Sequence, residues 1–94
     1  MAEIIRTDGT VKPVSPTAKD GTFEMAHLQG IVGGYFAIIY LDDDRVMVVH
    51  ESGHLEGLDH NEVASEMANE GRDGVPYTLV GNVLYCTRAE VEPQ

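Results

Sequence analysis

Short apolar blocks divide the chain, and each block predicts one element of secondary structure. Residues 3–6 hold an apolar pair between charged side chains and lead into Asp8-Gly9, a dipeptide typical of hairpin turns. Residues 10–16 are extended and contain two prolines, which cannot donate backbone hydrogen bonds to a neighbouring strand. We therefore expect an edge strand or an arm there, and such an edge leaves oligomerisation open.

Two segments have the 3.6-residue period of an amphipathic helix. The first begins after Thr22, whose hydroxyl is expected to cap it, and Gly33-Gly34 is expected to end it because glycine adopts the left-handed conformation at little cost. The second covers residues 61–69, where apolar side chains again fall on one face.

Three further blocks predict strands. Residues 35–41 and 45–50 are aromatic and β-branched, and the acidic triplet between them is expected to form the tip of a hairpin. Residues 77–87 alternate, with Gly81 as a bulge or a point of close approach, and residues 89–94 are expected to fray. The chain is thus predicted to form a single α+β domain, residues 1–94, with a small, mostly antiparallel sheet and one or two helices packed on one face.

Composition agrees with a small globular protein. The 94 residues are 43% hydrophobic and 23% charged, and no apolar stretch is long enough to cross a membrane. The first residues lack the layout of a signal peptide. The lone cysteine, Cys86, has no partner for an internal disulfide, which indicates a reducing cytoplasm.

Negative charge is concentrated in one segment. The whole chain carries −10, and residues 42–73, with ten acidic side chains and two arginines, carry −8. This balance argues against direct nucleic-acid binding and favours either solubility alone or an acidic face for a basic partner, of which DNA mimicry is one version. The candidate partner-binding residues are Asp42, Asp43, Asp44, Glu62 and Glu66.

Residues 50–60 read HESGHLEGLDH and match the zinc signature of the metzincin peptidases at every fixed position. On a helix, His50 and His54 would share a face as zinc ligands, His60 would be the third ligand, and Glu51 would be the general base. A zinc metallopeptidase is therefore one hypothesis for the function.

Other features argue against this zinc site. The apolar run before the motif is β-branched and disfavours a helix there, and 94 residues leave little room for a peptidase. The alternative interpretation is a hairpin whose tip is residues 51–53, with residues 54–58 as the outgoing strand. The histidines would then not converge, and no cofactor is expected.

A second set of residues resembles a family of small proteins of unknown function from bacteriophages and mobile elements. The resemblance rests on Val32-Gly33-Gly34-Tyr35, on Val46 to Val49, on Glu51-x-Gly53-x-Leu55-x-Gly57-Leu58-x-x-Asn61, and on Gly81 before a closing apolar strand. The three histidines depart from the pattern of that family, which places asparagine near position 50 and lysine near 54.

The resemblance implies a non-enzymatic phage-type accessory protein in the host cytoplasm, without membrane insertion. Such a protein is expected to bind and modulate or inhibit a host factor, either a protein or a small signalling ligand. Two turns of the family pattern supply candidate ligand-binding residues. Backbone amides could approach an anion at Gly33, Gly34 and Tyr35, and the turn between Gly57 and Asn61 is the other candidate.

Overall fold

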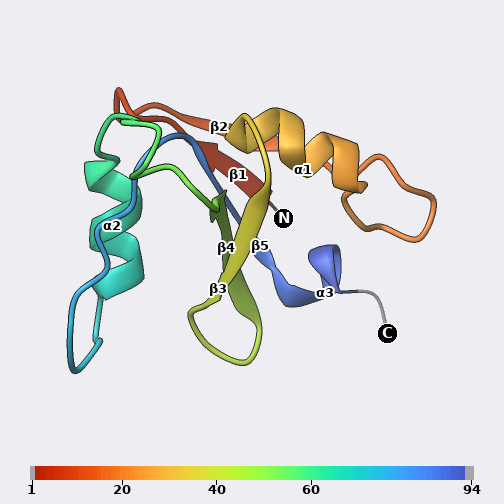
Figure 1. Ribbon diagram of the computed structural model, residues 1–94. Coiled ribbons are helices and arrows are strands. Elements are labelled where there is room, and N and C mark those ends of the chain that lie inside the picture. Colours follow the sequence, from red (N-terminus) through yellow and green to blue (C-terminus); the bar gives the residue numbers. More distant parts are fainter. Residues whose placement is uncertain (1, 93–94) are drawn as a thin grey trace.

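Five antiparallel strands form a sheet at the centre of the molecule in the computed structural model, which describes residues 2–92 (Figure 1). The strands are β1 (Ala2–Ile5), β2 (Val11–Val14), β3 (Phe36–Tyr40), β4 (Arg45–His50) and β5 (Val83–Thr87). Strand content and helices together confirm the predicted small α+β class.

The strand order is β2-β1-β5-β4-β3, so two hairpins flank the last strand. Asp8-Gly9 forms the turn between β1 and β2, and β2 lies at the edge, as its prolines predict. The acidic triplet forms the tip of the β3–β4 hairpin, also as predicted. β5 pairs with β1 on one side and with β4 on the other.

Three helices complete the fold: α1 (Met25–Val32), α2 (Glu62–Asn69) and α3 (Arg88–Val91). Gly33 ends α1 with φ 87°, a left-handed conformation that the predicted glycine stop requires. The start of α1 was predicted wrongly: its N-cap is Glu24, and the hydroxyl of Thr22 donates to Asp20 instead. α3 replaces part of the expected frayed end, while residues 93–94 lie outside the described residues.

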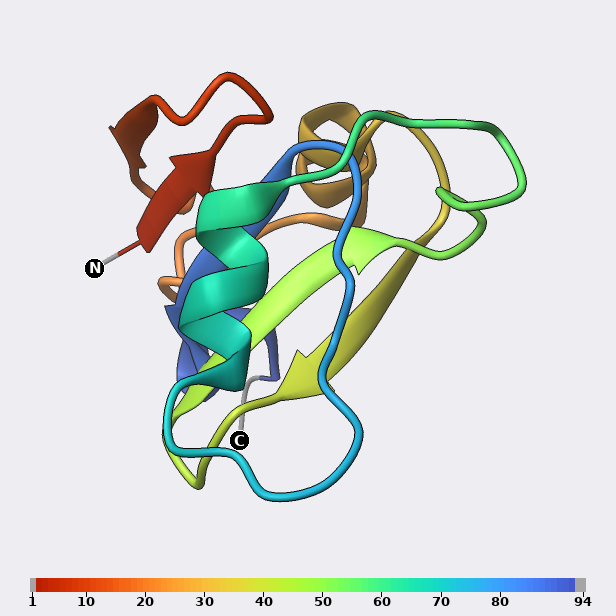
Figure 2. The same cartoon turned by 90° about the vertical axis from the view of Figure 1, so that its left-hand side faces the viewer.

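Helices lie against both faces of the sheet rather than one, which corrects the predicted arrangement. On one face α1 buries Leu28 and Val32 against a cluster that includes Val46 and Val48 of β4. On the other face α2 buries small side chains against a cluster that includes Met47 (Figure 2). The physical reason is that successive side chains of a strand point to opposite faces, and all three of these β4 residues are fully buried.

Two segments predicted as strands are irregular. Residues 51–57 form consecutive turns, so the outgoing strand expected at 54–58 is absent from the described chain. Of residues 77–82, only Val80 forms a β-bridge, to His60. Gly81 has φ 75° and lies against Leu58, where an added Cβ would come within 2.8 Å of Leu58 Cδ1. The predicted close approach at Gly81 is therefore confirmed.

Among the described residues no helix is both long and apolar enough to span a membrane.

Candidate functional site

The loop after β4 holds His50 between two hydrogen bonds. The backbone N–H of Ser52 donates to His50 Nδ1 at 3.0 Å, so the ring proton belongs on Nε2. His50 Nε2 lies 2.6 Å from Glu56 Oε2, and the imidazole is only 7% exposed. Both ring nitrogens of His50 are thus engaged within the loop.

The other two histidines of the zinc-like motif have different partners. His54 Nε2 donates to the carbonyl oxygen of Thr78 at 2.9 Å, and His60 Nε2 lies 3.4 Å from the hydroxyl of Ser65. The motif occupies a strand end and turns instead of a helix, so His50 and His54 do not share a helical face. Within residues 2–92, no three His, Cys, Asp or Glu side chains are placed to hold one metal ion.

Gly33, Gly34 and Tyr35 lie beside the start of this loop. A Cβ on Gly34 would come within 2.6 Å of His50 Nε2, and the backbone N–H of Glu51 donates to the Tyr35 carbonyl at 2.9 Å. The turn after α1 therefore packs directly on the loop after β4. The Tyr35 side chain is 75% exposed, so it is open to a partner or ligand.

Asn61 is fully buried, whereas Gly57 is exposed with φ 67°. The Asn61 amide donates to the carbonyl oxygens of Ile5 at 2.9 Å and Gly81 at 2.8 Å, and its Oδ1 accepts from the Ala64 N–H at 3.1 Å. It caps α2 and joins three separate segments. These bonds use both hydrogens of its amide, which gives Asn61 a structural role.

The acidic side chains gather over α2 and the neighbouring hairpin tip. Glu62 and Glu66 are exposed one turn apart on α2, and Glu70, the exposed C-cap residue, extends this stripe past the end of the helix. Asp42, from the hairpin, lines the same hollow as Glu70. The structure therefore brings the hairpin tip beside the C-terminal end of α2, whereas Glu62 and Glu66 do not line this hollow.

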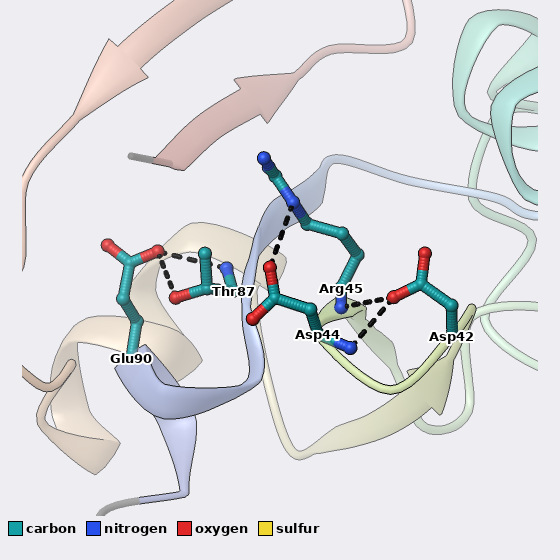
Figure 3. A network of polar contacts seen from close by, with 5 residues as sticks. All are labelled: Asp42, Asp44, Arg45, Thr87 and Glu90. Carbon is teal, nitrogen blue, oxygen red and sulfur yellow. Dashed lines mark hydrogen bonds and ion pairs between the residues drawn. The ribbon is translucent and has the colours of Figure 1, made fainter.

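Backbone hydrogen bonds shape the hairpin tip (Figure 3). Asp42 Oδ1 accepts from the N–H groups of Asp44 and Arg45, both at 2.8 Å, and these bonds lower the pKa of Asp42. The guanidinium of Arg45 lies 3.8 Å from the exposed carboxylate of Asp44. Asp42 consequently stays ionised at neutral pH, and Asp43, beside it in the turn, is exposed.

A hollow of about 550 Å³ lies beside this acidic tip and contains residues that the sequence analysis did not single out. Its wall includes three of the four tyrosines and two of the four arginines: Tyr40, Tyr77, Tyr85, Arg45 and Arg72. The guanidinium carbon of Arg72 lies 4.1 Å from the ring centroid of Tyr77, and that of Arg45 lies 5.5 Å from the ring centroid of Tyr85. Tyrosine and arginine are the side chains that dominate binding energy in protein interfaces. No short sequence motif could indicate these tyrosines and arginines, because they are spread between positions 40 and 85 and come together only in the folded protein.

Cys86 is buried in β5 and is predicted to be unreactive in the native protein. Burial, together with the charge of Glu90, raises the pKa of its thiol to about 12. We expect no modification by a chromogenic disulfide reagent at pH 8 in the folded protein, and one thiol per chain after denaturation in urea. Rapid reaction of the folded protein would contradict this prediction.

Comparison with known proteins gives a family but no function. The family described as a domain of unknown function (DUF3846) matches residues 3–92. No curated protein and no solved structure matched the chain.

Proposed function

The chain belongs to the DUF3846 family, and we propose that it is a non-enzymatic accessory protein of a phage or mobile element that binds and inhibits a host protein. The partner would carry a basic surface, and nucleic-acid-binding proteins of the host cytoplasm are the class that presents such surfaces. Binding would occupy the surface formed by Asp42, Asp43, Asp44, Glu62, Glu66 and Glu70, which we call the acidic surface.

The observation that carries this proposal is the position of the tyrosine–arginine hollow where the hairpin tip meets the C-terminal end of α2. Asp42 and Glu70 belong to its wall, together with Tyr40, Tyr77 and Arg72. Interfaces that bind tightly combine a central pocket with aromatic and arginine side chains and a charged rim that steers association. A surface that served solubility alone would have no need of such a pocket.

The three glutamates of this surface are available to a partner. They form no ion pair within the described residues, and Tyr40, which lines the hollow with Glu70, is 50% exposed. Unpaired surface carboxylates raise the rate of association with a basic partner at low salt. Added salt shortens the Debye length and so removes this effect.

The test neutralises the stripe without changing its shape. In the triple variant Glu62→Gln, Glu66→Gln and Glu70→Gln, we expect retention of the specific host partner at about 50 mM salt to fall at least tenfold. Raising the salt to about 300 mM should weaken the wild type in the same direction. Retention is measured by quantitative mass spectrometry of proteins captured from host lysate.

The matched control carries Glu3→Gln, Glu24→Gln and Glu51→Gln, which remove the same charge at positions outside the acidic surface. It should retain the partner at the wild-type level. Equal losses in both triple variants would mean that only net charge matters, and retention by both would mean that the acidic surface does not bind. Either result contradicts the proposal.

A further inference from the structure

A separate hollow of about 400 Å³ lies on the α1 side of the sheet, away from the acidic surface. Its lining comes from α1, the end of β1 and the residue before β5, and its size is within the range of small-molecule sites. The lining residues are Ile4, Arg6, Ala26, His27, Gly30, Ile31 and Asn82. None of them is acidic, although the chain carries a net charge of −10.

Arg6 brings a positive charge to this hollow. Its guanidinium forms no ion pair within residues 2–92. The carboxylate of Asp8 attracts Arg6 electrostatically, but its hydrogen bonds are accepted from the Thr10 N–H and hydroxyl at 2.9 and 2.7 Å. Lys12 adds a second positive charge near the hollow, because it pairs with Ile4 across β1 and β2 and cross-strand partners project from the same face. The lining of the hollow therefore carries a positive charge on an acidic molecule.

Two further side chains offer hydrogen-bond donors to it. Asn82 Oδ1 accepts from the N–H of Thr7 at 3.3 Å, which leaves its NH₂ group without a protein acceptor among the described residues. His27 packs on Phe23, and its Nδ1 is shielded from solvent with no hydrogen-bond partner in the described chain. A buried N–H without an acceptor is costly, so the proton of neutral His27 belongs on Nε2, where it can be donated to a ligand.

Gly30 has no reason in the fold to be glycine. It lies inside α1, its φ is not positive, and a Cβ built on it would meet no atom within 4 Å. Glycine disfavours a helix interior, but it lets a bound molecule approach the backbone closely. Its place in the wall of the hollow is consistent with that second property.

We propose that this hollow binds a small organic oxyanion, with a carboxylate or phosphate group on Arg6 and an apolar part against Ile4, Ala26 and Ile31. The planar guanidinium suits both groups, since each accepts two parallel hydrogen bonds. Asn82 and His27 would donate to the same oxyanion. The site shares no residue with the acidic surface. Its test is therefore independent of the test for the proposed protein partner.

NMR titration of the intact protein tests this site with four probes: acetate, benzoate, inorganic phosphate and phenyl phosphate. We expect saturable shifts at the Gly30 backbone amide and the Asn82 side-chain amide, with the aromatic probes binding more tightly than acetate or phosphate. Preference for benzoate would assign a carboxylate ligand, and preference for phenyl phosphate would assign a phosphate ligand. No saturable shift at these groups with any probe would overturn the proposal.

Variants separate binding in the hollow from attraction by charge alone. Arg6→Gln should weaken the best probe at least tenfold, whereas Lys19→Gln, which removes one positive charge outside the hollow, should leave its affinity within twofold. Gly30→Leu should abolish binding by filling the space, and Gly30→Ala should raise the melting temperature because alanine favours the helix. Equal affinity of the Arg6→Gln and wild-type proteins would contradict the proposal, as would unchanged binding by Gly30→Leu.

Discussion

Replacing Asn61 with alanine should lower the free energy of unfolding by about 3–5 kcal/mol, because a helix cap and two buried hydrogen bonds are lost together. The carbonyl oxygens of Ile5 and Gly81 would lose their bonds to the Asn61 amide, and the Ala64 N–H would lose its cap. Urea unfolding followed by circular dichroism measures the effect.

Two controls divide this loss into its parts. Asn61→Ser can still cap α2 but cannot donate to both carbonyl oxygens. It should therefore lower the free energy of unfolding by about 1 kcal/mol less than Asn61→Ala does. Asn69→Ala removes two bonds to the Tyr77 backbone at a partly buried position and should cost only about 1–2 kcal/mol. If Asn61→Ala proves no more costly than Asn69→Ala, the buried network is not the support that we describe.

Replacing Gly81 with alanine should cost about 2–3 kcal/mol, because two penalties coincide at this position. The residue has φ 75°, and the new Cβ would lie 2.8 Å from Leu58 Cδ1. Gly71→Ala is the matched control, since φ is 68° there but a Cβ would have no neighbour within 4 Å. It should cost about 1 kcal/mol, and the difference in urea midpoint measures the steric part.

A double-mutant cycle assigns the steric part to Leu58. Adding Leu58→Ala to Gly81→Ala should remove the clash, so the two substitutions together should cost less than the sum of their separate effects. Simple additivity would mean that Leu58 moves aside freely and that only the backbone conformation of Gly81 matters.

Most strands and the second helix could be predicted from local patterns, because periodicity and turn residues determine them within a few positions. The placement of helices on both faces also had a local signal that the sequence analysis did not use. Val46, Met47 and Val48 form a continuous apolar run, and such a run is typical of a strand that is buried on both sides. Alternation would be expected if only one face were covered.

The short helix α3 had a signal as well. Thr87 and Glu90 have the spacing of a capping box, and Glu90 Oε1 accepts from the Thr87 N–H and hydroxyl, both at 2.9 Å. By contrast, no local signal reveals why residues 77–82 do not continue β5. The Asn69 side chain binds both backbone groups of Tyr77, and that contact exists only after α2 has packed.

The candidate sites show the same division. The acidic stripe of α2 could be read from spacing alone, since Glu62 and Glu66 recur at one helical turn. The tyrosine–arginine hollow combines residues from the β3–β4 hairpin, the end of α2 and β5, and the Arg6 hollow combines residues from opposite ends of the chain. Similarly, the zinc-like string is satisfied letter by letter, yet β4 extends through His50 and turns follow it. The motif could bind zinc in the metzincin manner only on a helix, where His50 and His54 would share one face.

The central position of β5 also constrains the order in which the protein folds. The β1–β2 and β3–β4 hairpins are local and can form early, but they have no direct pairing with each other. Within residues 2–92, strand pairing joins them only through β5, and on one side it pairs segments about 80 residues apart in the sequence. Pairing over such separations is slow. During synthesis, therefore, the two hairpins exist as separate pieces until β5 leaves the ribosome, and the sheet closes in one late step.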